Sequence, residues 1–572
     1  MELKMKIWPN AYQRLSAIQW ARIAILVLNI GFATQSPTQQ VMRRDPPPPA
    51  GPKPVMGWNS FWPIGCGKHV NQGDLQKQAD LLAQTGLNTA GYSTFVVECA
   101  WEDWANKDGT PNTKKSTFHD GIGPFVDYLK SKGLNLGFGT WAGGQLCKRD
   151  PHEKFHGGDV PKNLKAYVAK LVEWGVTYLS HRPCDLASPD RLQYPDQASP
   201  LNARYVQMED AIRDAGVKLF YATSQWGASP EASNQLRANS WRIADDTRDN
   251  WNSFIRTLNA AVPYAPKTRP GSYSDLGFLQ LGENKLISPE MLTQFAFWAA
   301  AKSPLIFSSD LSKVHPDFIE VLKNPGVIAI NQDNLGKSIT LRRRYSDDKD
   351  VWSGPLSDGS TVAVIVNWED HTSLKHIDLA DMGFSSAHLY DVWHGKDLGP
   401  VNGTYSSHVG GHGCLFLKLT ETKPAPKINF KRFPAETADV MGSARLKDVT
   451  PKIKAVSRIS PNGGGGVRWT IPDIQTKGDV LFSIDFINAQ LATGDEDDSK
   501  LNFKRTVITV NDDKKVTVDF PISGLLWEEV YEGFLVSLPL TPGDNKILIE
   551  GVNEWAPDFV CLSVEQKPEQ AS

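Results

Sequence analysis

The alternation of short apolar runs with helix-like segments between residue 55 and about residue 335 most constrains the fold of this chain. Residues 74–85, 123–132, 163–174 and 203–215 carry apolar side chains at helical spacing, and each segment is followed by a short apolar run, at 94–97, 134–139, 176–179 and 217–222. Such an alternation is typical of parallel strands joined by helices. About eight such units in roughly 280 residues predict a closed (β/α)8 TIM barrel over residues 54–335.

After residue 335 the helix-like segments give way to runs of β-forming residues. Residues 336–420 contain β-rich runs, at 338–342, 361–368, 388–392 and 414–419, which predict an antiparallel β domain. A Pro-containing linker is expected at 421–427. Further strand-like runs at 480–486, 506–510, 534–538 and 545–551 predict a C-terminal β-sandwich over residues 428–567. The predicted fold class is therefore multidomain, a barrel followed by two β domains.

The first 53 residues predict a targeting segment and a spacer. Four basic residues precede an apolar run at 23–33, which has the length of a signal-peptide core and is short for a membrane span. Arg43-Arg44 suggest processing, and prolines 46–49 make a stiff spacer. We expect a secreted protein. The alternative is an uncleaved signal anchor, which would be the only reason to expect a membrane partner.

Composition narrows the class of partner. The net charge of -3 gives no electrostatic case for binding nucleic acid. The 18 tryptophans favour a carbohydrate-handling surface, although core packing also uses them. The six cysteines are too sparse for a dense disulfide scaffold and allow one or two bridges.

The best candidate for chemistry is the acidic stretch 240–251, which contains Asp245 and Asp246 and is framed by Trp241 and Trp251. An aromatic face packs on a pyranose ring while a carboxyl group transfers protons, so the stretch suits sugar chemistry. A solvated surface loop is the alternative interpretation.

Eight motifs in one order carry a family resemblance: 57–61 (Gly-Trp-Asn-Ser-Phe), Gly91-Tyr92 with Glu98-Cys99, 132–137, 174–179, Trp241-Arg242 with Asp246, Pro270-Gly271 with Asp275, 303–306, and Asn331-Gln332-Asp333. In kind and spacing they resemble the α-galactosidases of glycoside hydrolase family 27 over roughly residues 54–420. The resemblance implies hydrolysis of a terminal α-linked galactose or a related sugar, with no cofactor and no catalytic metal in the barrel.

The same resemblance assigns roles to individual residues. Asp246 aligns with the acid/base, with Asp245 as the nearest competitor. Family-like substrate contacts are implied for Trp58, Glu98, Trp141, Arg182, Gln225, Arg242 and Asp275.

Several of these positions depart from the family pattern. Arg182 stands where the nucleophilic aspartate is expected, and an arginine cannot attack a sugar carbon at ordinary pH. Ser180 replaces a lysine, Gln225 a glutamate, and Trp141 and Gly277 two acids. Asp185 would reach the nucleophile position only after a local register change.

These departures leave three interpretations open. The first is an α-galactosidase-like hydrolase, supported by Asp246, Arg242, Asp275 and Glu98. The second is a carbohydrate-binding pseudoenzyme that has lost the nucleophile. The third is an inverting enzyme that uses one retained acid and an activated water.

The resemblance also implies features outside the catalytic pair. It pairs Cys66 with Cys99 and Cys147 with Cys184, and leaves Cys414 and Cys561 as buried thiols. Short motifs in residues 428–567 are similar to carbohydrate-binding modules of families 6 and 35. That similarity implies a structural calcium near Glu436 and Asp558, since this ion prefers oxygen ligands.

Overall fold

The computed structural model describes residues 53–566, except 66–69, 100, 104–105, 142–162, 183–199, 225–237, 282–285, 462, 476 and 493–499; the side chains of 141 and 200–204 are also outside the description. The apolar segment 23–33 and the spacer therefore lie outside the described residues. Among the helices that are described, none combines the length and the apolar character needed to cross a membrane.

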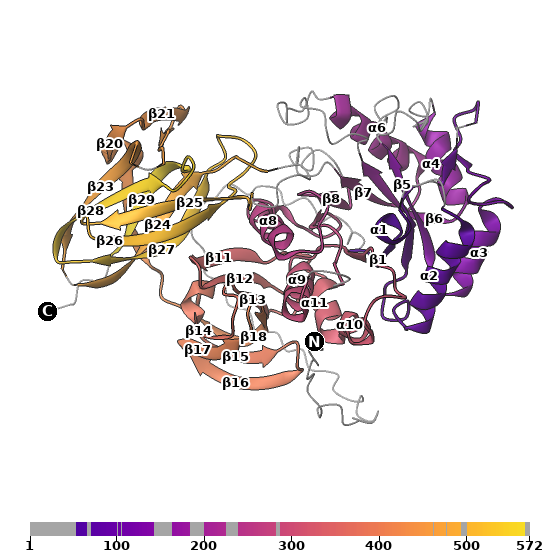
Figure 1. Ribbon diagram of the computed structural model, residues 1–572, viewed down its shortest axis with the longest axis horizontal. Coiled ribbons are helices and arrows are strands. Elements are labelled where there is room, and N and C mark those ends of the chain that lie inside the picture. Colours follow the sequence, from indigo (N-terminus) through magenta and orange to yellow (C-terminus); the bar gives the residue numbers. More distant parts are fainter. Residues whose placement is uncertain are drawn as a thin grey trace, which may run out of the picture. The chain divides into compact units, whose positions relative to one another are not determined.

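The first domain is a closed barrel of eight parallel strands (Figure 1). They run, in the order in which they pair, as β10 (Leu305–Phe307), β1 (Met56–Asn59), β2 (Thr94–Val97), β5 (Asn135–Trp141), β6 (Val176–Arg182), β7 (Phe220–Ser224), β8 (Ser240–Arg242) and β9 (Tyr273–Asp275). Leu279, just after β9, closes the ring, because its backbone N–H donates to the carbonyl of Ile306 at 2.9 Å. The predicted (β/α)8 barrel is confirmed.

Helices surround the strands, as Figure 1 shows. The described helices of this domain are α1 (Phe61–Ile64), α2 (Gln72–Gln84), α3 (Gly123–Ser131), α4 (Leu164–Glu173), α6 (Pro200–Ala215), α8 (Trp251–Ala261), α9 (Ser288–Ala300), α10 (Pro316–Leu322) and α11 (Pro325–Asn331). Asn71, Asn163 and Asn250 cap α2, α4 and α8 by accepting a backbone N–H of the first turn. Gly86 and Gly133 adopt positive φ just beyond α2 and α3, where the sequence predicts helix ends. A short hairpin, β3 (Glu102–Asp103) with β4 (Asn112–Thr113), and the 3-10 turn η1 (Ala265–Lys267) complete the domain.

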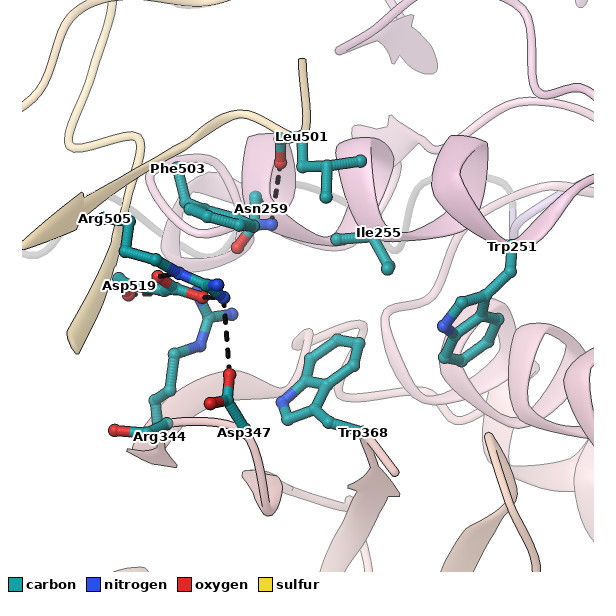
Figure 2. A pocket seen from close by; sticks show the side chains of 11 residues that line it. Trp251, Ile255, Asn259, Arg344, Asp347, Trp368, Leu501, Phe503, Arg505 and Asp519 are labelled. Atoms are coloured by element: carbon teal, nitrogen blue, oxygen red, sulfur yellow. Dashed lines mark hydrogen bonds and ion pairs between the residues drawn. The ribbon is translucent and has the colours of Figure 1, made fainter. Parts of the chain in front are cut away.

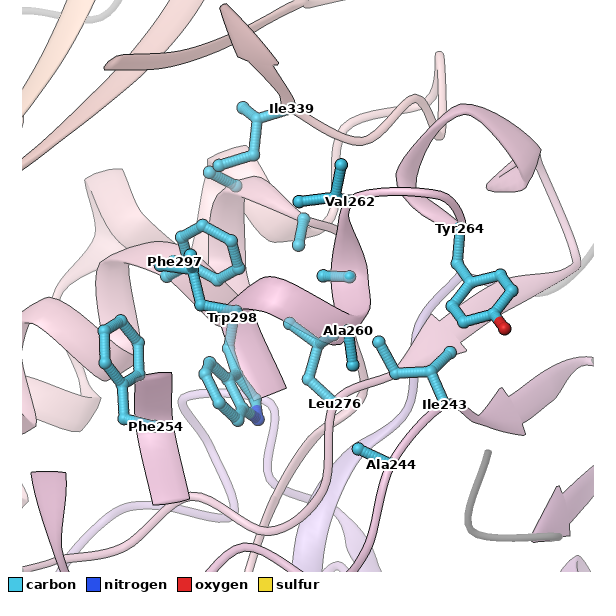
Figure 3. Packing of buried hydrophobic residues seen from close by; sticks show 14 of the residues in the cluster. Ile243, Ala244, Phe254, Ala260, Val262, Tyr264, Leu276, Phe297, Trp298 and Ile339 are labelled. Carbon is cyan, nitrogen blue, oxygen red and sulfur yellow. The ribbon is translucent and has the colours of Figure 1, made fainter. Parts of the chain in front are cut away.

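Aromatic packing holds α8 and α9 against the strands that carry the acidic stretch (Figure 3). Phe254 of α8 stacks on Trp298 of α9, with ring centroids 6.0 Å apart. Trp298 is fully buried, and its indole N–H donates to the carbonyl of Gly277 at 2.8 Å. The loop that follows β9 is therefore tied to the helix layer. Burial of one such side chain contributes about 1.5–3 kcal/mol.

The second domain is antiparallel, as predicted. Its strands are β11 (Thr340–Tyr345), β12 (Lys349–Pro355), β13 (Thr361–Asn367), β14 (Ser373–Asp378), β15 (Phe384–Asp391), β16 (Lys396–Asn402), β17 (Thr404–Val409) and β18 (Cys414–Pro424), with the 3-10 turn η2 (Leu379–Met382). The prediction of a linker at 421–427 is wrong in part. Residues 421–424 continue β18, and Pro424 pairs with Phe384. The proline is tolerated because it is the last residue of the strand.

The third domain contains two packed antiparallel sheets, the predicted sandwich. One sheet has the order β21 (Arg445–Thr450), β22 (Ile453–Ser457), β29 (Asp558–Gln566), β24 (Gly478–Ile487) and β27 (Tyr531–Leu540), with β19 (Asn429–Pro434) also on β29. The other has the order β20 (Asp439–Gly442), β23 (Gly465–Ile474), β28 (Gly543–Gly551), β25 (Phe503–Val510) and β26 (Lys514–Pro521). The 3-10 turn η3 (Ala435–Thr437) follows β19.

Hydrogen bonds join α8 of the barrel to the loop before β25. The Asn259 amide donates to the carbonyl of Leu501 at 2.8 Å, and the Asn502 amide donates to the carbonyl of Arg256 at 3.1 Å. Helix α8 thus follows the acidic stretch in sequence and also contacts the third domain.

Candidate active site

The carboxyl ends of the barrel strands bring polar and aromatic side chains to one rim. In a parallel barrel all strands end on the same face, so residues distant in sequence meet there. The described residues that line the pocket are Asn59, Glu98, Tyr178, Ser180, Arg182, Ser224, Arg242, Asp246, Asp275, Gly277, Phe278 and Ile306. Their charged members are three carboxylates and two guanidinium groups.

Arg242, the last residue of β8, organises one side of the pocket. Its Nε lies 3.0 Å from Oδ2 of Asp275 at the end of β9, and its Nη1 donates to the carboxylate of Asp246 four residues later. Burial by itself lowers the pKa of Arg242, but the neighbouring carboxylates of Asp275 and Asp246 raise it well above its ordinary value. Arg242 therefore stays charged and positions both carboxylates.

Arg182 is the last residue of β6, which is separated from β8 by β7 alone. Its guanidinium forms an ion pair with Glu98, and it lies 5.0 Å from the ring centroid of Phe61, within cation-π range. Glu98 also accepts a hydrogen bond from the Asn59 amide. Burial lowers the pKa of Arg182 to about 10, so the side chain is still a cation at neutral pH. The position of the family nucleophile thus holds a positive charge.

The structure distinguishes the two neighbouring acids of the motif. Asp246 lines the pocket, whereas Asp245 pairs with Arg256 of α8 at 2.7 Å. Asp245 is therefore already used in anchoring the loop to its following helix, and Asp246 is the acid that a ligand in the pocket would meet.

The space enclosed by the described side chains is small, about 10 Å³. That volume is roughly what one water molecule needs. The two guanidinium groups and their carboxylate partners occupy the described part of the rim.

The other predicted contacts fall in different places. Trp58 is fully buried in the barrel core, donates its indole N–H to the carbonyl of Ser309 at 2.9 Å, and does not line the pocket. As a substrate contact it is therefore corrected to a core residue. The backbone of Trp141 pairs with that of Arg182 at the strand ends. Asp185 and Gln225 lie outside the described residues, as does the side chain of Trp141.

Sequence reasoning missed Asn59, Tyr178 and Phe278 as lining residues. Phe278 lies 5.2 Å from the Arg242 guanidinium, and Tyr178 contributes a buried hydroxyl whose pKa burial raises strongly. A usable signal was their position within, or just beyond, the short apolar runs, because such residues reach the same rim.

Glu102 is a half-buried acid that does not line this pocket. The hydroxyl of Tyr167 donates to its Oε1 at 2.7 Å, and Thr140 lies at 3.5 Å from Oε2. Burial raises the pKa of Glu102 to about 7, against the opposing effect of these hydrogen bonds.

The residues of the third domain do not fit a calcium ion near Glu436 and Asp558. The Asp558 carboxylate is 2.6 Å from the ammonium group of Lys447, which neutralises it, and Glu436 is exposed. Throughout the described residues, no group of three or more Asp, Glu, His or Cys side chains could hold a metal.

The cysteines are described only in part. Cys99 takes part in a disulfide, while Cys414 and Cys561 are free, the second buried and the first half-buried. Cys66, Cys147 and Cys184 lie outside the described residues, so the pairs Cys66 with Cys99 and Cys147 with Cys184 stay predictions.

A parallel barrel with carboxylates at its strand ends is an architecture that places active sites at that rim. Residues 54–333 match the family described as alpha galactosidase A, and residues 346–419 match the alpha galactosidase C-terminal beta sandwich domain. Together the two matches span more than half of the chain. The barrel and the second domain are therefore similar to those of α-galactosidases, and the chain resembles a glycoside hydrolase of that kind.

Individual relatives agree with this resemblance. The probable alpha-galactosidase D of Aspergillus terreus is 35% identical over 387 residues, an alignment that covers 65% of this chain and 56% of that protein. The chain thus spans little more than half the length of this relative. The structure of alpha-galactosidase I from Mortierella vinacea has a TM-score of 0.58 at 25% identity, covering 65% of this chain and 98% of that one.

The fold resemblance also extends beyond the first two domains. The isomalto-dextranase of Arthrobacter globiformis T6 covers 90% of this chain and 96% of its own, with a TM-score of 0.51 at 16% identity. This likeness concerns the fold alone.

Proposed function

We propose that the chain is a secreted glycoside hydrolase that acts on a terminal α-linked galactose or a related sugar, with Asp246 as its acid. The observation that carries the proposal is the placement of Asp246 and Asp275 around Arg242 at adjacent strand ends. The Asp246 side chain keeps 16% of its surface exposed, so its carboxyl group can reach a ligand at the rim. The similarity to α-galactosidases supplies the class of substrate.

In this proposal the Asp246 carboxylate takes up a proton and delivers it to the glycosidic oxygen as the bond from that oxygen to the sugar carbon breaks, and the water that adds to the sugar carbon releases one proton in return. The guanidinium of Arg242 holds the carboxyl group in place at the end of β8. The group that completes the reaction at the sugar carbon is water, directly in inverting chemistry or after a covalent step in retaining chemistry.

Arg182 favours a second candidate, a carbohydrate-binding protein of the same fold that does not turn over its ligand. A carboxylate nucleophile is absent from position 182, and the guanidinium found there is held by Glu98. A guanidinium has neither the free electron pair nor the pKa of a nucleophile.

Hydrolysis of a nitrophenyl α-galactoside by the full chain and by Asp246→Asn tests the first candidate. Asp246→Asn keeps the shape of the side chain and removes its transferable proton, so turnover should fall by at least about 100-fold. Equal rates for the two proteins would refute the role of Asp246. The anomeric form of the first product, followed by NMR, distinguishes inversion from retention.

A double variant tests the second candidate. Ser180→Lys with Arg182→Asp places a positive charge where the family has its lysine and supplies the missing carboxylate; it lowers the net charge of the pocket by one unit, against two for Arg182→Asp alone. If the wild type is inactive and this variant hydrolyses the galactoside, the natural protein is a binding form. If the wild type is active and the variant loses that activity, Arg182 belongs to a working site. Arg182→Asp alone is the matched control, because it leaves two carboxylates without a cation.

A further inference from the structure

A second cavity, of about 160 Å³, lies where three segments distant in the sequence meet (Figure 2). Helix α8 contributes Trp251, Ile255 and Asn259. The second domain contributes Arg344, Ser346, Asp347 and Trp368, and the third contributes Leu501, Phe503, Arg505 and Asp519. None of these residues lines the pocket at the strand ends.

Two half-buried tryptophan rings form one wall of this cavity. The ring centroids of Trp251 and Trp368 are 6.0 Å apart, with planes tilted by 58°. Trp251 also stacks on His412 at 4.5 Å, and the Trp368 indole N–H donates to Asp350 at 3.0 Å. These contacts fix both rings before any ligand arrives, so a ligand that packs on them restricts little additional side-chain motion.

An unused hydrogen-bond acceptor lies in the same wall. Asn259 is fully buried, and its Nδ2 donates to the carbonyl of Leu501. Among the described residues its Oδ1 has no hydrogen-bond partner, and Figure 2 shows this oxygen turned away from Leu501. Buried acceptors of this kind are costly unless a ligand or water satisfies them. A ligand hydroxyl donating to Asn259 would do so.

Of the four charged side chains that line the cavity, Arg505 and Asp347 reach the solvent, whereas Arg344 and Asp519 are buried. Arg505 donates to both carboxylate oxygens of Asp519 at 2.7 Å and to Asp347 at 3.3 Å. The side chain of Arg505 is 41% exposed and that of Asp347 is 76% exposed. Arg344 is neutralised in turn by Asp350. The mouth therefore offers donors and acceptors with no large net charge, which favours a neutral polar ligand.

We propose that this cavity is a second carbohydrate site, which binds one pyranose unit of a neutral saccharide. A cavity of about 150 Å³ encloses benzene, and a pyranose has about twice as many non-hydrogen atoms, so this cavity holds part of one sugar ring while the remaining hydroxyls face the solvent. The ring packs against Trp368, one hydroxyl donates to Asn259, and others bond to Arg505 and Asp347. Such a combination of a flat apolar wall with a few fixed polar groups is typical of small-molecule sites.

The position of the cavity suggests what the site contributes. Trp251 begins α8 and comes five residues after Asp246, so the loop bearing the proposed acid leads directly into the cavity wall. A saccharide bound in this cavity stays on the protein and leaves the strand-end pocket open for another sugar unit. This role requires binding only, so it stands whether or not the barrel site turns over.

Calorimetric titration of the full chain with methyl α-D-galactopyranoside and methyl α-D-glucopyranoside tests the proposal. Trp368→Ala should weaken binding of the bound probe at least about tenfold, since it removes the stacking wall. Asp347→Ala should weaken it about threefold, and because that side chain is mostly exposed the fold should not change. Thermal unfolding of each variant checks that it is folded.

Two controls locate the binding. Trp555→Ala removes a tryptophan of the third domain that is 51% exposed and does not line the cavity, and Asp246→Asn alters only the strand-end pocket. Both should leave the affinity for this site unchanged. The proposal is wrong if neither methyl glycoside binds the full chain. It is also wrong if Trp555→Ala or Asp246→Asn loses binding while Asp347→Ala binds as tightly as the wild type. If Asp246→Asn loses hydrolysis but still binds the methyl glycoside, hydrolysis and binding occur at two different sites.

Discussion

We predict how much the free energy of unfolding falls when the buried ion pair between Arg182 and Glu98 is broken. Arg182→Met removes the guanidinium and keeps much of the length of the side chain. Both partners are almost fully buried, at 5% and 2% exposure. The variant leaves Glu98 with the Asn59 amide, and it leaves three pocket carboxylates facing Arg242 alone.

The size of the effect follows from the environment of the pair. Two opposite charges about 4 Å apart attract by about 4 kcal/mol in a medium of effective dielectric constant 20, and removal of one partner of a buried pair costs about 3–5 kcal/mol. We expect Arg182→Met to lose about that much free energy of unfolding. Glu98→Gln should lose less, because Arg182 remains near Asp246 and Asp275, both of which favour its charged form.

The double variant Arg182→Met with Glu98→Gln should recover most of the loss, since it leaves neither group charged and unpaired. Urea unfolding at pH 7, followed by near-UV circular dichroism, measures all three. Lys170→Ala, which breaks the surface pair with Glu173, is the control and should change stability by less than about 1 kcal/mol. If Arg182→Met unfolds at the same urea concentration as the wild type, the ion pair does not stabilise the fold and the prediction is wrong.

Three further predictions concern other buried groups. Because the pKa of Glu102 is raised to about 7, the folded protein keeps a proton that the unfolded chain releases above pH 4.5. The free energy of unfolding should therefore fall by up to about 3 kcal/mol as the pH rises from 4.5 to 7. In urea titrations at a series of pH values, Glu102→Gln should show a smaller fall than the wild type. Arg344→Met should lower the free energy of unfolding by about 3–5 kcal/mol, since it strands the fully buried Asp350, with Arg344→Met/Asp350→Asn as the recovering control. Peptide mapping of the non-reduced protein should recover the linked pair Cys66 with Cys99; Cys99 linked to another cysteine would contradict the assignment.

Local sequence patterns were sufficient for most of the secondary structure. Strand β2 has the predicted limits, 94–97, and α3 and α4 end within one residue of prediction. These elements could be read because the spacing of apolar residues records which face is buried, and glycines with positive φ mark the helix ends. The linker at 421–427 was misread, because proline and lysine signal a loop locally even where the backbone still pairs with a neighbouring strand.

The candidate site was predictable only in part. The family resemblance over Trp241 to Trp251 implied Asp246, but it left Asp245 as a competitor, and the structure pairs Asp245 with Arg256. That choice depends on which way each carboxylate faces around the end of β8. The side chains of adjacent residues point in different directions from the backbone. Which of the two carboxylates faces the pocket is set by the packing of α8, where Arg256 pairs with Asp245.

The order of the domains and the parallel barrel could be predicted from the sequence, because each depends on periodicity within a short window. The tertiary structure alone decided that Arg182 meets Glu98 across the pocket and that Trp251, Trp368 and Phe503 surround one cavity. Those residues lie on different strands or in different domains. Their proximity depends on how the barrel closes and how the β domains pack on it, and no local pattern of apolar residues encodes that geometry.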